Sequence, residues 1–167
     1  MSETTRETQA TISHWCELTF GPVSTNVRVA IRANEELAEL MEKVASDAPA
    51  AEAGVEVADV VIVLTRLASR LGVGAATLSL PGKESSLARA VAAVNKEMAS
   101  LLRSLALDDN NPNARGLLCR LLSSLYGLGP HLGLRIADEV DSKMAINRAR
   151  VWKLDGSGHG YHVPPQA

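Results

Sequence analysis

Aromatic residues are scarce in this chain of 167 residues: they make up 3% of it, whereas hydrophobic residues as a group make up 46%. A core has to be built from Ala, Leu and Val, a mixture that suits helix-on-helix packing better than a sheet sandwich. The length fits one domain of ordinary size. The composition therefore predicts a single all-α domain, a helical bundle, over residues 1–167.

Excess positive charge is also absent. The net charge is −2, which excludes the basic footprint of a nucleic-acid-binding protein. The two cysteines, Cys16 and Cys119, are too few for a disulfide framework and indicate a reducing, cytoplasmic location. No apolar run is long enough to span a bilayer, and the polar start of the chain is not expected to act as a signal peptide. We therefore expect neither nucleic acid nor membrane as a partner.

Helical spacing of apolar residues, interrupted by Gly and Pro, predicts six helices. The helix that is apolar nearly all round at its centre, 51–71, should be the most buried. Residues 1–6 are expected to be a disordered start, 75–83 a linker, and 153–167 a Gly-rich flexible tail without regular structure. The helices are expected over residues 7–19, 27–46, 51–71, 84–107, 114–128 and 134–152. Within 27–46 the buried positions are expected to be Val27, Ala30, Ile31, Leu37, Leu40, Met41 and Val44.

The helix pair 27–72 is followed by a degenerate copy of itself, the pair 84–133. A shift of 61 residues places 34–72 over 95–133 without a gap, and 11 of the 39 positions are identical. Both copies have the order helix, loop, helix and terminal glycine. The copy keeps its packing face but loses acidic residues, so chemistry explains the acids of the first pair better than folding does. Glu36 matches Glu97, whereas Glu39, Glu56 and Asp59 are matched by Ser100, Leu117 and Arg120.

Four acidic residues of the first pair form two i, i+3 pairs: Glu36 with Glu39, and Glu56 with Asp59. Each pair shares a helical face, and two antiparallel helices would bring all four together. Bare carboxylates at close range repel, so a cation is expected among them, and Mg²⁺ prefers such oxygen ligands. For the first pair alone, a solvated surface is the better explanation. It explains the second pair poorly, because a charge beside the most apolar helix needs a reason.

The last predicted helix, 134–152, carries a second group of polar residues. Lys143, Asn147 and Arg150 follow at i, i+4 and i+7 and therefore share a face suited to phosphate oxygens. Arg148 points elsewhere unless the helix frays. An ordinary surface bridge from Lys143 to Glu139 is the alternative, and the spacing alone does not choose between them. In the tail, His159, Tyr161 and His162 predict either a lid over a site or a frayed terminus, and the two histidines are a weak metal signal.

These motifs resemble those of the MazG-like all-α nucleoside triphosphate pyrophosphohydrolases. The resemblance rests on the motif Glu36-x-x-Glu39 followed after sixteen residues by Glu56-x-x-Asp59. The segments 56–64, 143–152 and 158–163 are similar to the phage-type branch, which includes dATP/dGTP diphosphohydrolases and MazZ-like enzymes. The resemblance covers residues 12–73 and 134–163. Residues 74–133 depart from it, because a minimal member has no inserted helix pair there.

The resemblance implies hydrolysis of a nucleoside triphosphate, with a purine such as dGTP favoured, to the monophosphate and pyrophosphate. A metal-bound water would attack the α-phosphorus, and Glu35 would either orient that water or support the metal ligands from behind. The resemblance also implies homodimers or homotetramers in the cytoplasm, the host cytoplasm if a phage encodes the chain. Two or three Mg²⁺ or Mn²⁺ ions would be held by Glu36, Glu39, Glu56 and Asp59. The triphosphate would be held by Lys143, Asn147 and Arg150, with Arg148 as a helper. Candidates for contact with the base are Asn34, Trp15, Phe20 and Tyr161.

Two other functions are alternatives to this one. A non-enzymatic helical interaction or regulatory module would treat the acids as surface residues, and divalent cations would then change neither melting temperature nor nucleotide binding. A ferritin-like di-metal oxidase would use Glu-x-x-His ligand pairs. No histidine lies three residues after any of the four acids, which counts against the oxidase.

Overall fold

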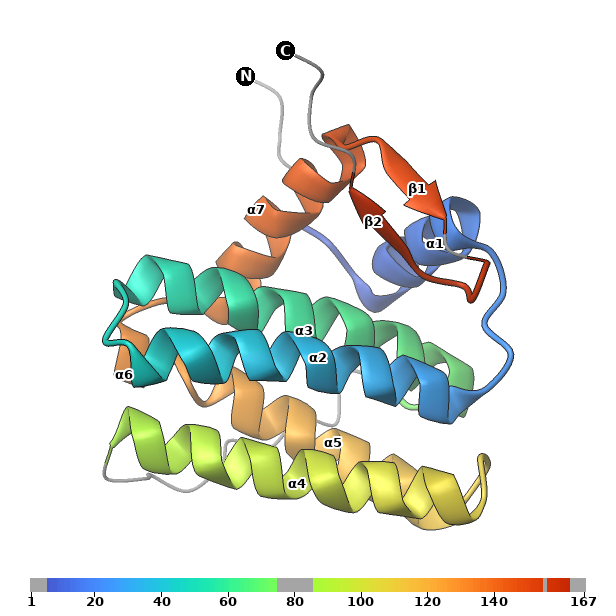
Figure 1. Cartoon of the computed structure of the whole chain (residues 1–167), viewed down its shortest axis with the longest axis horizontal. Helices are drawn as coiled ribbons and strands as arrows, with labels where there is room; N and C mark the ends of the chain where they lie inside the picture. The colour runs from blue at the N-terminus through green and yellow to red at the C-terminus, as the bar shows by residue number, and fades with distance from the viewer. Residues whose placement is uncertain (1–5, 75–85, 155, 163–167) are drawn as a thin grey trace.

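The computed structural model describes residues 6–74, 86–154 and 156–162, and over these residues the chain is an all-α bundle with one small hairpin (Figure 1). The all-α prediction is therefore confirmed. The predicted linker 75–83, the first five residues of the predicted disordered start and the end of the tail lie outside the described residues. The elements are α1 (Gln9–Phe20), α2 (Asn26–Ala45), α3 (Ala50–Leu71), α4 (Leu87–Leu107), α5 (Pro112–Tyr126), α6 (Gly129–Leu132), α7 (Ile136–Ala149), β1 (Trp152–Leu154) and β2 (Gly160–His162).

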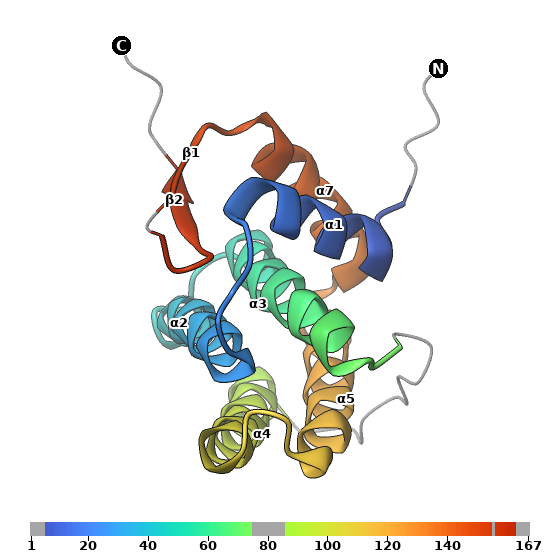
Figure 2. The ribbon, with the colours of Figure 1, turned by 90° about the vertical axis from the view of Figure 1, so that its right-hand side faces the viewer.

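Helix α3 lies at the centre of the molecule. It contacts α2, α1, α5, α6 and α7, and Figure 2 shows α1 and α7 on one side of it with α4 and α5 on the other. Thirteen of its 22 residues are buried, as expected for the segment whose apolar residues lie nearly all round the helix. Because α2 runs antiparallel beside α3 (Figure 1), the acidic faces of the two helices meet on the side covered by α7 and the hairpin.

The internal repeat is visible in the caps and the packing of the two helix pairs. Thr25 caps α2 by accepting from the amide of Arg28, and Ser86, 61 residues later, caps α4 by accepting from the amide of Arg89. Gly72 and Gly133 end the two copies in the same left-handed conformation, which suits a residue without a Cβ. Buried positions correspond as well: Val29, Ala30, Ala33, Leu37 and Leu40 match Ala90, Val91, Val94, Met98 and Leu101.

Two residues predicted to be buried on α2 are exposed. Ile31 is 48% exposed and Met41 39% exposed. The face of α2 that packs against α3 and α4 is instead the one carrying Val29, Leu37 and Leu40, which are fully buried. The apolar residues of α2 span a wider arc than its neighbours cover.

The end of the chain was predicted incorrectly in two respects. The helix expected over 134–152 begins at Ile136 and ends at Ala149. The tail that was expected to lack regular structure forms an antiparallel hairpin, in which Trp152 pairs with His162 and Leu154 with Gly160. Glycine permits rather than prevents this turn, because Gly156 and Gly158 adopt φ values of 79° and 86°, which other residues rarely adopt.

Within the described ranges, we find no helix that combines the length and the apolar character needed to cross a membrane.

Candidate active site

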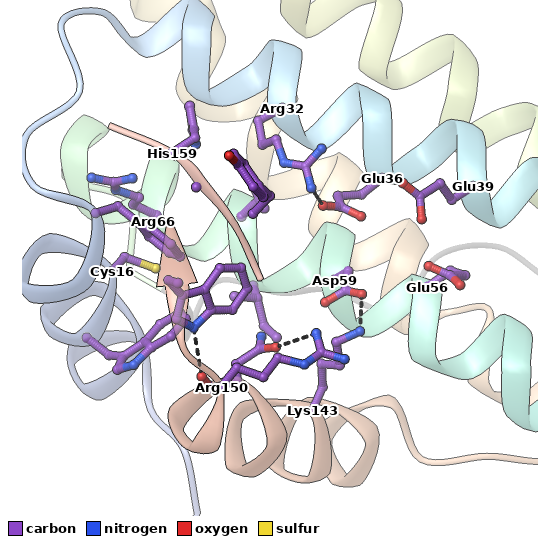
Figure 3. Close-up of a pocket in the computed structure, with 18 residues that line it drawn as sticks. Cys16, Arg32, Glu36, Glu39, Glu56, Asp59, Arg66, Lys143, Arg150 and His159 are labelled. Carbon is purple, nitrogen blue, oxygen red and sulfur yellow. Dashed lines mark hydrogen bonds and ion pairs between the residues drawn. The ribbon is translucent and has the colours of Figure 1, made fainter. Parts of the chain in front are cut away.

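A cavity of about 310 Å³ opens between α1, α2, α3, α7 and the hairpin (Figure 3). All four acids of the sequence motif line one end of it: Glu36 and Glu39 come from α2, Glu56 and Asp59 from α3. Carboxylate oxygens of Glu36, Glu56 and Asp59 lie within 4.8 Å of one another. The antiparallel helix pair therefore brings the two i, i+3 motifs together, as the spacing predicted.

The helices deliver these acids because each motif lies at the border of a packing face. Glu36 directly precedes the fully buried Leu37 on α2 and is itself only 7% exposed. Asp59 lies between the fully buried Ala58 and Val60 on α3. Such neighbours hold the carboxylates partly out of bulk water. A charge in that position is costly unless it has a partner.

Helix α7 forms the opposite wall of the cavity. The ammonium of Lys143 lies 2.5 Å from a carboxylate oxygen of Asp59, so the predicted alternative, a surface bridge to Glu139, is not the arrangement found. Asn147 is buried and lines the cavity. Arg150 caps the C-terminus of α7 in an extended conformation and still lines the cavity, where its guanidinium donates to the side-chain oxygen of Asn147 at 3.5 Å.

Arg32 also lines the cavity and is an addition to the predicted set. It forms an ion pair with Glu36 one turn later on α2, and a second one with Glu35 at 2.9 Å. The spacing of four residues to Glu36 is the sequence signal that could have identified it.

Glu36, Glu56 and Asp59 have raised pKa values, first because they are partly buried and second because neighbouring carboxylates repel one another. Burial raises the pKa of Glu36 to about 7, and the nearby Asp59 adds to the rise. Burial also raises the pKa values of Glu56 and Asp59, with Glu39 adding to both. Arg32 opposes the rise at Glu36, and Lys143 opposes it at Asp59. The resident cations therefore neutralise the cluster only in part.

Aromatic rings line the other end of the cavity. Trp15 and Phe20 come from α1, and Trp152 and Tyr161 from the hairpin. Trp152 packs edge-on against Trp15 and Phe20, with ring centroids 6.0 and 5.1 Å apart, and its indole donates to the carbonyl of Asn147 at 2.9 Å. Three of these four aromatic residues are among the candidates for contact with the nucleobase. Trp152 joins them because β1 begins shortly after the end of α7.

Arg66 fixes the hairpin to the helices. Its side chain is buried on α3, where a charge needs partners. The guanidinium donates to Glu17 of α1 at 2.9 Å, to the carbonyl of Gly21 at 2.5 Å and to the carbonyl of Gly158 in the hairpin turn at 2.7 Å. A cation inside the most apolar helix was a signal in the sequence, of the same kind that drew attention to Asp59.

Three residues predicted for the site lie outside the cavity. Arg148 faces away from it, and its guanidinium binds the carboxylate of Glu7 at 2.9 Å, so it is not placed to help hold a phosphate. Glu35 is exposed and lines a smaller neighbouring cavity of about 240 Å³. Asn34 is half-buried on α2 and lines neither cavity.

The donor set fits a hard divalent cation. Three carboxylates converge within 4.8 Å, and every candidate ligand atom is an oxygen. Besides burial, repulsion from neighbouring carboxylates raises the pKa values of Glu36, Glu56 and Asp59, and a bound cation would relieve that repulsion. Glu39, which is more exposed, would complete the ligand set from the same helix as Glu36. The residues present therefore fit Mg²⁺ or Mn²⁺.

Comparison of the chain with family models, curated proteins and solved structures finds no match. The functional assignment accordingly rests on the chemistry of this cavity and on the sequence motifs.

Proposed function

We propose that this chain is a metal-dependent nucleoside triphosphate pyrophosphohydrolase of MazG-like type, converting a nucleoside or deoxynucleoside triphosphate to the monophosphate and pyrophosphate. One observation carries the proposal. A single cavity has four carboxylates at one end, the cations Lys143 and Arg150 on the facing wall, and aromatic rings at the other end. These are the groups that a divalent cation, a triphosphate and a base would each require.

In the proposed reaction each wall has a separate role. Glu36, Glu39, Glu56 and Asp59 would hold Mg²⁺ or Mn²⁺, two or three ions per site, which when bound supply a nucleophile at neutral pH and stabilise charge on the phosphates. Lys143 and Arg150 bind phosphate oxygens from the opposite side, and the amide of Asn147 adds an uncharged donor. The two walls hold the α-phosphorus between the acids and the cations, so that water reaches it from the acidic side.

The aromatic end of the cavity would hold the base. Trp15, Phe20 and Trp152 offer a rigid apolar surface, and Tyr161 of the hairpin faces the same space. Stacking on such rings is tolerant of sequence because every base has a π face. The rings therefore do not choose among the bases. The preference for a purine comes from the phage-type resemblance, with dGTP as the first candidate and the adjustment of nucleotide pools for phage DNA synthesis as the role.

The cell compartment and the assembly belong to the same proposal. The enzyme would act in the cytoplasm, the host cytoplasm if a phage encodes it, on a small-molecule substrate. A homodimer or homotetramer is implied by the resemblance, and light scattering on the purified chain measures it directly.

A panel of common ribo- and deoxynucleoside triphosphates, each with Mg²⁺ or Mn²⁺, tests the activity. The expected result is release of pyrophosphate, abolished by a chelator, with the highest rate for dGTP. Asp59→Ala and Glu39→Ala should abolish turnover and retain the helical circular dichroism of the parent. Release of single phosphate, or normal rates in either variant, would contradict the proposal. Comparable rates for all substrates would favour a house-cleaning role over a phage-specific one.

A further inference from the structure

We infer that Arg32 is a phosphate-binding residue with two partners. While no divalent cation is bound, its guanidinium serves as the counter-ion of Glu36. When a cation binds Glu36, the guanidinium binds the phosphates of the substrate instead. The inference rests on the proposed function and adds a residue and a sequence of contacts to it. It arises from the structure, since Arg32 belongs to no motif on which the proposed function was built.

The position of Arg32 allows it to reach both partners. It precedes Glu36 by one turn of α2, and its guanidinium reaches over the wall of the cavity to form an ion pair with the Glu36 carboxylate (Figure 3). The side chain is one-third exposed, whereas that of Glu36 is 9% exposed. The cation therefore comes from the solvent side, and the carboxylate it neutralises lies inside.

Arg32 and a metal ion compete for Glu36. The guanidinium occupies one oxygen of the Glu36 carboxylate, and its positive charge repels a cation that approaches the other oxygen. Asp59 is neutralised in the same way, because Lys143 of the facing wall forms an ion pair with its carboxylate. Two of the three carboxylates that converge within 4.8 Å are thus each held by a cation from the protein.

Glu35 explains how the displaced guanidinium stays in place. Its carboxylate lies 2.9 Å from the other terminal nitrogen of the Arg32 guanidinium. Glu35 is exposed and does not line the cavity, so a metal ion in the cavity would not bind it. When Glu36 is taken, the bridge to Glu35 continues to hold Arg32 at the rim, and one set of N–H donors becomes available to an anion.

The negative charge of a bound triphosphate is a second reason to expect a free cation on the α2 side of the cavity. The cavity lining contains four carboxylates, and of its cations Arg66 is fully engaged by Glu17 and two carbonyls. Lys143 and Arg150 both approach from α7 and the segment after it. A triphosphate between the two walls would therefore meet protein cations from one side alone if Arg32 stayed on Glu36.

The test compares Arg32→Gln with Arg28→Gln, a matched control one turn earlier on α2 that lines only the smaller cavity. Binding of Mn²⁺ without nucleotide is measured by calorimetry at pH 8.5, and turnover is measured separately. We expect Arg32→Gln to bind Mn²⁺ about tenfold more tightly than the parent and to lose at least tenfold in kcat/KM. Arg28→Gln should match the parent in both. Arg32→Lys, which keeps the charge, should retain the parent's Mn²⁺ affinity and recover part of the turnover.

The outcomes separate this inference from the function it rests on. If the parent binds Mn²⁺ and releases pyrophosphate but Arg32→Gln binds Mn²⁺ no more tightly, Arg32 is not a competitor and the inference is overturned while the function stands. Unchanged kcat/KM in Arg32→Gln likewise overturns its role at the phosphate. A parent that neither binds Mn²⁺ nor releases pyrophosphate overturns both. Melting temperatures of the three variants identify any that fail to fold, and Arg32→Lys then provides the comparison.

Discussion

Glu36 is the most buried of the four acids and the one whose counterpart survives in the second helix pair. That counterpart, Glu97, lies on α4 without the other three acids, which are matched by Ser100 of α4 and by Leu117 and Arg120 of α5. The chain thus contains its own control. A carboxylate alone on a helix should not bind a divalent cation, whereas the same residue type in a cluster of oxygen ligands should.

Glu36→Gln is predicted to abolish the rise in melting temperature that Mn²⁺ causes in the parent, and Glu97→Gln is predicted to leave it unchanged. The glutamine retains the size of the side chain and removes the charge that a hard cation requires. Thermal unfolding with and without Mn²⁺ measures both variants. Equal responses of the two would show that the cluster on α2 and α3 is not the binding site.

The effect of the metal on stability is predicted to depend on pH through Glu36, whose pKa burial raises from 4.5 to about 7. A raised pKa means that the metal-free folded chain holds this proton more tightly than the unfolded chain, so the group's contribution to stability falls as the pH rises from 4.5 to about 7. Cation binding needs the ionised carboxylate. The rise in melting temperature with Mg²⁺ should therefore be larger at pH 8 than at pH 6.

The same measurement on Glu36→Gln is the control, because that variant is expected to show no metal-induced rise at either pH. A Mg²⁺-induced rise that is equal at the two pH values, or larger at pH 6, would argue against Glu36 as a ligand.

At the scale of elements, the hairpin is the part of the site that the sequence pattern did not predict. The helices followed from apolar spacing and from Gly and Pro breaks, and the antiparallel pair brought the predicted acids together. The glycines of the tail predict a lack of regular structure. Glycine has little preference for any one backbone conformation, but it does not prevent a strand or a turn from forming. What orders it is tertiary: Arg66 reaches the Gly158 carbonyl, and Trp152 packs on α1. A local pattern contains neither contact.

Other differences between prediction and structure have the same cause. Ile31 and Met41 continue the apolar period of α2 but lie beyond the arc that its neighbours cover. Arg148 belongs to the motif on α7 but faces Glu7, at the other end of the sequence. Periodicity gives the angle of a side chain around its helix, whereas the partner it meets depends on how the helices are arranged.

Gly158→Ala is predicted to detach the hairpin from the helices, and Gly156→Ala is its matched control. Both glycines have positive φ, so each substitution costs about 1–2 kcal/mol from the backbone alone. A Cβ at Gly158 would also lie 2.7 Å from Val23 Cγ2 and 2.9 Å from the Pro22 carbonyl oxygen, whereas at Gly156 it would meet nothing within 4 Å.

Tryptophan fluorescence reports the result, because Trp152 lies at the base of the hairpin against Trp15. A red shift and a raised KM are expected in Gly158→Ala, and little change in Gly156→Ala. Identical spectra and KM values in the two variants would contradict the attachment described here.

At the scale of the whole molecule, the second helix pair supports the site without contributing to it. Helix α4 packs on α2 and α5, and α5 packs on α3, so the copy forms the underside of the same core. Leu101, the counterpart of Leu40, is fully buried in it. The described acids, cations and aromatic rings of the cavity all come from the other elements of the chain.

Leu101→Ala is predicted to lower the free energy of unfolding by about 2–5 kcal/mol, the usual cost of a cavity in a packed core. Leu107→Ala, on the same helix but 80% exposed, should change it by less than about 0.5 kcal/mol. Urea denaturation followed by circular dichroism measures both. A small effect of Leu101→Ala would mean that the second pair does not share the core of the first.

The central claim is that the acids of α2 and α3 form a metal-dependent centre for pyrophosphate release. The most direct test is the rate of pyrophosphate release from dGTP with Mg²⁺ or Mn²⁺ by three proteins: the parent, Asp59→Asn and Glu97→Gln. The account predicts equal rates for the parent and Glu97→Gln and a loss of at least a hundredfold in Asp59→Asn. Retained activity in Asp59→Asn, or no pyrophosphate release by the parent from dGTP or any other triphosphate, would contradict it.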